Sequence, residues 1–260
     1  MRINRSASRT IDIIQLLSKK QKPITLTEIS KTLGLPKSST LEILNTLISK
    51  QIIEFGEEGT KTFKIGWKLL EMTVATLSQN DLHKVARSHL EELSHLTGET
   101  VFLAIEDSGQ MVYLDKVEGA SMIRATASLG SRVPLHCGAL GKAFLAALPD
   151  SRIAELTSGI ELKPYTQYTI TNYPKLLEEI RRIRKQGYAV DNEEYLRDIF
   201  CLGAPIFNQS DQPIASISVS MPVHKIDEKK KDEFASFIIR TAMNLSRRLG
   251  FTGNRIYFER

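Results

Sequence analysis

The sequence has little cysteine: its 260 residues include only Cys137 and Cys201. Two cysteines are too few for a disulfide-stapled scaffold, and by themselves they cannot form a zinc site. Long apolar runs are also missing, since the longest, residues 143–148, falls far short of a membrane span. The N-terminus has no apolar stretch of the kind found in signal peptides. We therefore expect a reduced, cytoplasmic protein that has no membrane partner.

The chain has instead the composition of a globular protein, with 42% hydrophobic and 25% charged residues, and a length that suits two domains. Its charge is unevenly distributed. Residues 1–80 hold 12 Lys and Arg against 7 Asp and Glu, whereas residues 81–260 hold 23 of each kind. The whole net charge of +5 therefore lies in the first 80 residues, as expected if that part neutralises phosphates.

Residues 25–49 carry the pattern of two short helices joined by a tight turn. Thr25 and Glu28 have the spacing of a capping box, in which each side chain bonds to the other residue's backbone amide. Gly34 permits a left-handed stop, and Pro36 suits the opening of the next helix. This segment is therefore predicted to be a helix-turn-helix.

The second helix of this motif is predicted to read DNA. We expect it to bury four apolar side chains, Leu41, Leu44, Leu47 and Ile48. Its opposite face would place small hydrogen-bonding groups in the major groove of double-stranded DNA. The candidate DNA contacts in the motif are Thr25, Lys37, Ser38, Ser39, Thr40, Glu42 and Asn45.

Two short strands are predicted next, at residues 52–55 and 62–65. A two-stranded hairpin that follows a helix-turn-helix is a wing, and Lys61 and Lys64 are placed to contact backbone phosphates. The acidic residues at 57 and 58 argue against a deeply inserted wing tip.

The N-terminal segment, residues 1–9, is rich in arginine. Arg5 and Arg9 are candidate contacts of a flexible basic arm that reaches a phosphate or the minor groove. A frayed, solvated terminus explains the same residues equally well. Apolar residues between positions 11 and 17 then predict a first helix that packs beneath the other two.

We predict three segments along the chain: a winged helix-turn-helix domain at 1–78, a linker helix at 79–98 and an effector-binding domain at 99–260. The linker helix carries a leucine-rich stripe and ends at Gly98. A long amphipathic helix at such a junction often joins two copies of a protein, although it can equally pack on its own domain. A shorter connecting helix is expected at residues 67–77.

The second half alternates predicted strands and helices. Strands are expected at 100–105, 111–117, 122–127, 188–191, 201–207 and 213–220, and helices at 139–148, 151–156, 173–186 and 227–249. Early hairpins, a helical middle, returning strands and a closing helix describe an α+β domain with helices on the faces of a sheet.

Three stretches together resemble the isocitrate lyase regulator (IclR) family of bacterial transcription factors. They are LGLPKSS at 33–39 with FKIG at 63–66, GSRVPLHCGALGKA at 130–143, and GYAVDNEE at 187–194 followed by CLGAPIFN at 201–208. The resemblance implies an α+β protein in which a winged helix-turn-helix is joined by a linker helix to a GAF- or profilin-like α/β effector-binding domain. It also implies a homodimer or homotetramer that pairs through both domains.

The chain departs from the family pattern at a few positions. Glu42 stands where relatives often have Arg, Gln51 where many have Gly, and residues 196–200 replace a Pro-Gly and a basic residue. These departures concern the operator sequence and the effector rather than the fold. A carboxylate at position 42 could accept from the amine of a cytosine.

The resemblance assigns a small-molecule pocket to the second domain. Its implied effector contacts are Met122, Ala125, Val133, Ala139, Leu140, Asp191, Ile199, Cys201, Ser218 and Ser220. The residues themselves support part of this, because Ser216, Ser218 and Ser220 alternate along one predicted strand and so share a face. A solvent-facing strand surface is the alternative for this row.

A small carboxylate is the ligand that the sequence favours. Ala139 and Leu140 open a helix, where free amides and the helix dipole form an anion site. Arg132 and Lys142 are either direct anion partners or structural ion pairs. Asp191 would repel a carboxylate beside it and is better suited to accept from a ligand hydroxyl or to orient a neighbouring residue.

Three other interpretations remain open at this point. Cys201 with His136 can be written as a thiol nucleophile and its base, although no third group orients them. Zinc bound by His136, Cys137, Cys201 and His224 is disfavoured, because only the adjacent pair lies close in sequence. A DNA-binding architectural protein without a ligand is the third.

We therefore predict a non-enzymatic, ligand-responsive transcriptional regulator that needs no cofactor and no metal. It is expected to repress a catabolic operon, bind double-stranded operator DNA, and sense a small carboxylate-bearing metabolite. A transcriptional activator of the same family is the alternative, ahead of an enzyme that uses Cys201.

Overall fold

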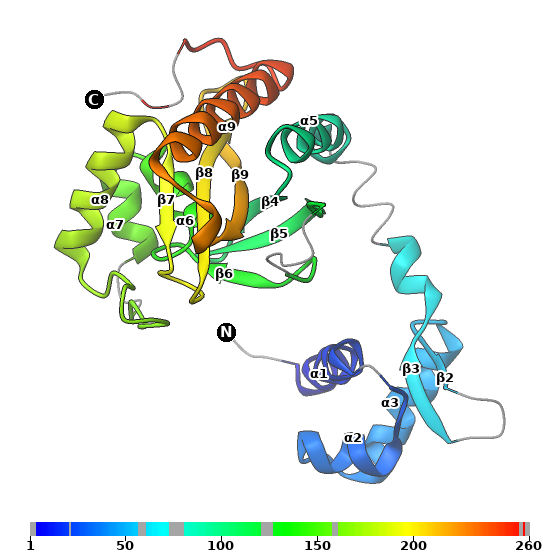
Figure 1. Cartoon of the computed structure of the whole chain (residues 1–260). Helices are drawn as coiled ribbons and strands as arrows, with labels where there is room; N and C mark the ends of the chain where they lie inside the picture. Colours follow the sequence, from blue (N-terminus) through cyan, green and yellow to red (C-terminus); the bar gives the residue numbers. More distant parts are fainter. Residues whose placement is uncertain are drawn as a thin grey trace. The chain divides into compact units, whose positions relative to one another are not determined.

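The computed structural model describes residues 4–20, 22–56, 61–72, 81–120, 127–157, 161–254 and 257. The chain forms two compact units, residues 1–80 and 81–260, and each is described by itself (Figure 1). The sequence-predicted strand at 122–127, with the candidate residues Met122 and Ala125, lies almost entirely outside the described residues, as does the wing tip at 57–60. Within the described ranges, no helix is both long and apolar enough to cross a bilayer.

The first unit is a winged helix. Its helices are α1 (Arg5–Lys19), α2 (Leu26–Leu33) and α3 (Lys37–Ser49), and residues 67–72 are also helical. Three short antiparallel strands, β1 (Ile24–Thr25), β2 (Ile53–Phe55) and β3 (Thr62–Ile65), form a sheet in the order β1-β3-β2. The two predicted wing strands are confirmed, whereas β1 was not predicted because two residues carry no periodic signal.

Local sequence determines where α2 and α3 begin and end. The Glu28 amide donates to Thr25 Oγ1 at 3.2 Å, while the Thr25 amide donates to the Glu28 carboxylate at 2.7 Å, so the predicted capping box is present. Gly34 ends α2 at φ 64°, in the left-handed region that glycine adopts without strain. Pro36 is the residue before α3, again as predicted.

The predicted basic arm is wrong for the residues that the structure describes. Arg5 opens α1, whose first turn is capped by the Asn4 side chain, and Arg9 is a half-buried helix residue. This segment is helical because the Asn4 side chain accepts from the amides of Ser6 and Ala7, which satisfies two donors at the start of the helix. α1 buries Ile13 and Leu17 in a core that includes Ile29, Leu44 and Phe63 from the other elements.

The second unit is built on one six-stranded antiparallel sheet, in the order β6-β5-β4-β9-β8-β7. Its strands are β4 (Thr100–Asp107), β5 (Gln110–Val117), β6 (Arg132–Pro134), β7 (Ala189–Asn192), β8 (Ile199–Phe207) and β9 (Pro213–Pro222). Its helices are α5 (Asp81–Thr97), α6 (Ala139–Ala146), α7 (Asp150–Thr157), α8 (Tyr173–Gln186), the short 3-10 turn η1 (Val223–Lys225) and α9 (Glu228–Arg248).

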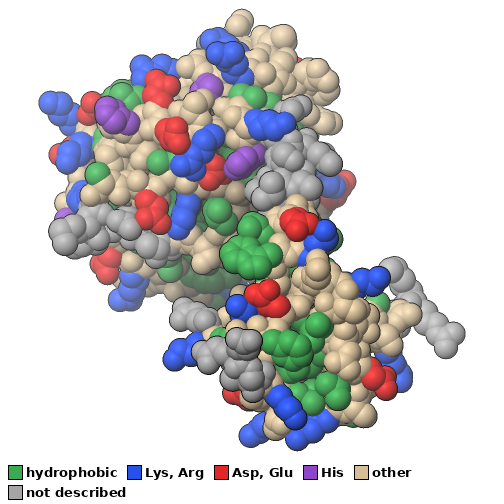
Figure 2. Space-filling model, turned by 90° about the vertical axis from the view of Figure 1, so that its right-hand side faces the viewer, with side chains coloured by type: hydrophobic (Ala, Val, Ile, Leu, Met, Phe, Trp, Pro, Cys, Tyr) green, Lys and Arg blue, Asp and Glu red, His purple; other side chains and the backbone are tan. Residues whose placement is uncertain are grey.

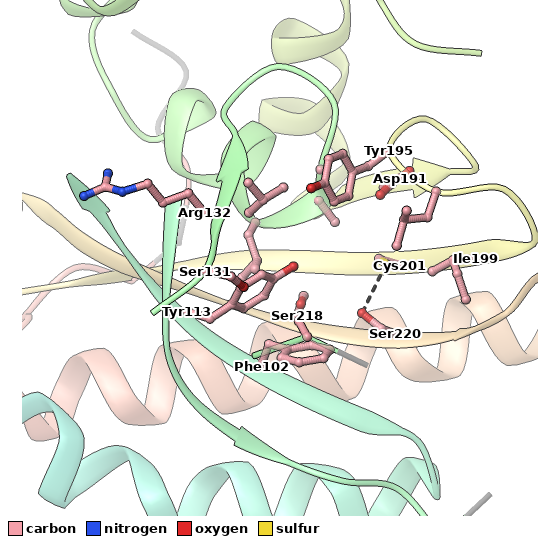
Figure 3. Close-up of a pocket in the computed structure, with 16 residues that line it drawn as sticks. Phe102, Tyr113, Ser131, Arg132, Asp191, Tyr195, Ile199, Cys201, Ser218 and Ser220 are labelled. Carbon is pink, nitrogen blue, oxygen red and sulfur yellow. Dashed lines mark hydrogen bonds between the residues drawn. The ribbon is translucent and has the colours of Figure 1, made fainter. Parts of the chain in front are cut away.

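Helices cover both faces of this sheet. Figures 1 and 3 show α6 on one side of the strands and α9 on the other. α5 packs beside α9 and against β4 and β5, and α8 packs on α6. Gly203 of β8 allows the start of α6 to approach the sheet, since a Cβ there would lie 2.5 Å from the Ala139 carbonyl oxygen. The α+β architecture expected from the sequence is confirmed.

The helix set apart as a linker, residues 79–98, corresponds to α5. Its stripe of Leu82, Ala86, Leu90 and Leu93 belongs to the core of the second unit, so it packs on that unit. This is the alternative that the sequence left open. The division at residues 78 and 98 stays a prediction.

Candidate functional site

A cavity of about 220 Å³ lies in the second unit, on the side of the sheet that α6 covers (Figure 3). Residues of β4, β5, β6, β7, β8 and β9 line it, together with the start of α6 and the loop after β7. The cavity therefore draws on segments more than 100 residues apart in the chain.

Nine of the sequence-predicted effector residues meet at this cavity. They are Arg132, Val133, Ala139, Leu140, Asp191, Ile199, Cys201, Ser218 and Ser220. Sequence reasoning missed seven further lining residues, Phe102, Tyr113, Ala127, Ser131, Gly138, Tyr195 and Leu196. Strand pairing would have found some of them: Phe102 is the cross-strand partner of Ser218, and the Tyr113 ring lies 5.0 Å from that of Phe102. Effector binding by these residues stays a prediction.

The serine row of β9 is buried rather than solvent-facing. Ser218 and Ser220 are 2% and 4% exposed, and both line the cavity. The Ser220 hydroxyl lies 3.1 Å from the Cys201 sulfur on the neighbouring strand, as the dashed line in Figure 3 shows. Ser216, on the same face, is fully buried but does not line the cavity. The alternative of a solvated strand surface is therefore wrong.

The N-terminus of α6 forms a second polar wall. Gly138 is its N-cap and has no side chain to cap the helix, and Gly138, Ala139 and Leu140 all line the cavity. The first intrahelical bond runs from the Lys142 amide to the Gly138 carbonyl, at 3.0 Å, so the amides of residues 139–141 have no partner in the helix. With the helix dipole, these donors favour a negatively charged group.

Asp191 is the acidic member of the cavity wall. It is 4% exposed, and its carboxylate accepts from the Glu194 amide at 2.7 Å. Burial raises the pKa of Asp191 to about 6, although the nearby charge of Lys142 opposes the shift. Near neutral pH this carboxyl group therefore exchanges between its charged and its neutral form.

A buried ion cluster holds the loop after β7 against α6. Lys142 is fully buried, and its ammonium contacts the carboxylates of Glu179 on α8 and Glu194. Burial raises the pKa of Glu194 to about 7, and one of its oxygens is buried with no partner among the described residues. Because Glu194 precedes Tyr195 and donates its amide to Asp191, Lys142 indirectly positions both lining residues.

The charges of Arg132 and of Lys142 are both engaged in ion pairs. Figure 3 shows the Arg132 side chain extending away from the serines, and its guanidinium pairs with the Asp107 carboxylate and donates to the Asp107 carbonyl. Lys142 does not line the cavity. Both side chains take part in ion pairs, so the α6 amides remain the candidate donors for an anion.

The cysteines are not arranged as nucleophiles. Burial raises the pKa of Cys137 and of Cys201, so both thiols are neutral, and Cys201 bonds to Ser220 rather than to a base. His136 Nε2 lies 3.1 Å from the Lys163 carbonyl oxygen instead. Among the described residues, no group of three His, Cys, Asp or Glu side chains is placed to hold a metal ion.

The exposed face of α3 differs from the predicted DNA-contacting face because Thr40 is buried and Leu41 is exposed. Lys37, Ser38, Glu42 and Asn45 are exposed, as expected, and Ser39 is half-buried. Thr40 is not on this face: it is fully buried, and its hydroxyl donates to the Pro36 carbonyl at 2.8 Å. Leu41, predicted to be buried, is 41% exposed.

The remaining candidate DNA contacts lie at the edges of the motif. The Thr25 hydroxyl is occupied by Glu28 in the capping box. Lys64 on β3 pairs with Glu54 across the wing at 3.1 Å, and Lys61 is exposed just before that strand. These lysines belong to the unit that carries the whole net charge. On the second unit, the face in Figure 2 shows basic and acidic side chains intermixed.

Two family models match the chain. Residues 6–56 match the IclR helix-turn-helix domain, and residues 74–247 match the bacterial transcriptional regulator IclR C-terminal domain. The second match alone spans more than half of the chain, and together the two account for both units.

Individual relatives agree with these matches over nearly the full length. The transcriptional regulator XynR of Escherichia coli is 31% identical over 251 residues, covering 96% of this chain and 99% of its own length. The transcriptional repressor IclR of the same organism is 30% identical over 96% of this chain and 91% of its own. The crystal structure of IclR from Thermotoga maritima superposes with a TM-score of 0.82 at 34% identity, over 95% of this chain and 99% of that one.

Proposed function

Because this chain belongs to the IclR family of bacterial transcriptional regulators, and is thus a DNA-binding regulator rather than an enzyme, we propose that its cavity binds a small metabolite that controls operator binding. The observation that carries this proposal is the convergence of nine predicted residues on one cavity. They come from four strands and the start of a helix, and packing of an apolar core alone does not require buried hydroxyls and the first amides of a helix at one cavity.

The ligand that best fits this wall chemistry is a small carboxylate with a hydroxyl or keto group. The α6 amides offer donors to a carboxylate, while Ser218 and Ser220 can donate to, or accept from, a second polar group. At about 220 Å³ the cavity is smaller than typical drug-sized pockets of roughly 300–1,000 Å³, so it suits a compact metabolite. Phe102 and Ile199 supply apolar walls for its carbon skeleton.

We propose α3 as the element that reads the operator. Ser38 and Asn45 lie on its exposed face, and an asparagine amide can bond bidentately to an adenine edge. Lys37, Lys61 and Lys64 provide phosphate contacts next to this face. Thr40 is not included, because it is buried.

The active species in this proposal is a homodimer or homotetramer in the cytoplasm. One recognition helix reads too few bases for genomic specificity, and two helices that bind half-sites about one helical turn apart, roughly 34 Å, supply the rest. Effector binding then changes operator affinity, and a coupling of about 1–3 kcal/mol corresponds to roughly 5- to 150-fold.

Repression of a catabolic operon is the proposed outcome. Among the relatives, IclR of Escherichia coli and AllR of Salmonella typhi are named repressors, whereas XynR is named only as a regulator. A transcriptional activator of the same architecture is the second candidate, because XynR and KdgR carry no such designation.

A titration tests the effector proposal directly. Isothermal titration of the full chain with a panel of small hydroxy- and ketocarboxylates, each paired with its uncharged amide, is expected to give binding of an acid but not of its amide. The same acid is expected to change operator affinity in a gel-shift assay. Absence of binding across the panel would favour a DNA-binding protein whose second unit only oligomerises, and turnover of a compound would contradict a purely regulatory role.

A further inference from the structure

The exposed face of α3 carries one large apolar side chain, Leu41, that the fold of the first unit does not require. Leu41 is 41% exposed, whereas Leu44 and Leu47 of the same helix are 0% and 5% exposed. The buried stripe runs through Thr40, Leu44 and Leu47, and Leu41 lies about 100° around the helix from its first member. Leu41 therefore contributes little to the core of the winged helix.

The neighbours of Leu41 on this face are polar. Ser38 stands three residues before it and Asn45 four residues after it, so the three side chains form one exposed stripe. Glu42 is also exposed and borders the stripe. A single exposed leucine is common on protein surfaces, but this one lies in the middle of the surface proposed to contact base edges.

Glu42 constrains how this surface meets DNA. A carboxylate laid against phosphates would be repelled, whereas at a base edge it can accept from the amine of a cytosine. With α3 in a major groove, Glu42 and the adjacent Leu41 would therefore face base edges rather than phosphates. Lys37, exposed at the start of α3, would then be available for a phosphate.

We propose, on the basis of the proposed function, that Leu41 reads a thymine by packing on its C5-methyl group. That methyl is the apolar group which a base pair presents in the major groove, so it is the matching partner for an exposed leucine between hydrogen-bonding side chains. With Glu42 accepting from a cytosine amine, each half-site of the operator contains a thymine close to a cytosine.

Base replacement tests this without altering the protein. An operator duplex is first selected by the full chain from a random-sequence DNA library, and each thymine is then replaced in turn by deoxyuridine, which lacks only the methyl group. At one thymine in each half-site the replacement is expected to weaken binding about fourfold, the equivalent of one buried methyl group. Uniform affinity at every position would overturn the proposal.

Two variants assign the effect to Leu41. For Leu41→Ala, binding to the parent duplex is expected to weaken, and the deoxyuridine duplex is expected to bind as well as the thymine duplex. Leu96→Ala is the matched control, because Leu96 is a helical leucine of the second unit with 40% exposure. It is expected to keep the full sensitivity to the missing methyl group.

The outcomes separate this inference from the proposed function. If Asn45→Ala weakens binding while deoxyuridine has no effect anywhere, α3 reads DNA but Leu41 does not read a methyl group. If Leu41→Ala changes the oligomeric mass in solution and keeps the deoxyuridine sensitivity, Leu41 is a contact between copies of the chain and the inference is overturned. If no substitution on α3 changes operator affinity, the proposed reading helix itself is wrong.

Discussion

Gly203 of β8 lies directly under Ala139, the first residue of α6, and a Cβ at position 203 would come within 2.5 Å of the Ala139 carbonyl oxygen. This close approach brings the free amides of α6 to the same cavity as the β9 serines. The glycine is required for steric reasons rather than for its backbone angle, because it is not among the glycines with positive φ.

Gly203→Ala is expected to push α6 off the sheet and to disrupt effector binding. The overlap with backbone atoms has no flexible side chain to absorb it, so the expected cost in unfolding free energy is about 1–3 kcal/mol. Denaturant unfolding and ligand titration measure the two effects. Gly34→Ala is the control: it strains a left-handed position at φ 64° in the first unit with no atom nearby, and it is expected to lower stability without affecting ligand binding.

Ser218→Ala combined with Ser220→Ala is expected to abolish the effector response and to spare DNA binding. Loss of two neutral hydrogen bonds at about 0.5–1.5 kcal/mol each corresponds to roughly 5- to 150-fold in ligand affinity. Calorimetry measures the affinity and a gel shift measures the response.

Ser216→Ala is the matched control for the serine pair. Ser216 lies on the same strand and face, is fully buried, and has a hydroxyl with no partner among the described residues. Its removal is expected to leave ligand binding unchanged and to stabilise the fold slightly, because an unsatisfied buried hydroxyl is lost. A normal effector response in the double variant would show that the ligand does not bind at the β9 serines.

The sequence predicted best where local chemistry decides the structure. α8 runs from Tyr173 to Gln186 as predicted, because Asn172 caps its start and Gly187 ends it at φ 92°. The cavity residues were predicted nearly as well, since strand alternation and the family resemblance point to the same face. The bounds of α8 do not depend on how distant segments meet, whereas for the cavity the family resemblance supplied that information.

The sequence predictions failed where tertiary packing determines which side chains face the core, the solvent or the cavity. Leu41 and Thr40 exchanged roles because apolar spacing alone does not determine which side of α3 faces the core. The role of Arg132 was left open between a ligand contact and a structural ion pair, because the sequence does not show that the hairpin between β4 and β5 brings Asp107 within reach of its guanidinium. Phe102 and Tyr113 were missed because their place in the cavity follows from strand order, which the sequence does not display.

Substitution of Ser38 or Asn45 by Ala is expected to weaken operator binding while folding and effector binding stay intact. A good bidentate contact contributes about 1–3 kcal/mol per base, so Asn45→Ala is expected to weaken binding roughly 5- to 150-fold for each half-site. Unchanged affinity in both variants would count against α3 as the reading helix.

Thr40→Val distinguishes the buried face of α3 from the reading face. The change keeps the shape but removes the hydroxyl that donates to the Pro36 carbonyl. The expected result is a loss of about 0.5–1.5 kcal/mol in unfolding free energy, with the base preference of the operator unchanged. A changed base preference, measured by selection from random DNA, would show that Thr40 does contribute to DNA recognition.

Carboxylate binding is expected to weaken as pH rises from 5 to 7. The pKa of Asp191 is raised to about 6 by burial, so the neutral form falls from about nine-tenths at pH 5 to about one-tenth at pH 7. Only the neutral form lacks repulsion for a carboxylate on the same cavity wall, so the apparent Kd is expected to rise about tenfold over this interval. Titration calorimetry at several pH values measures the trend.

Three variants identify the titrating group that causes this pH dependence. Asp191→Asn is expected to remove it, while Asp211→Asn, a change in an exposed turn, is expected to keep it. Glu194 is the competing group, because burial raises its pKa to about 7 and it contacts Lys142. If Glu194→Gln flattens the profile and Asp191→Asn does not, the titrating group is the ion cluster beside α6, and a carboxylate then lies farther from Asp191 than the cavity wall suggests.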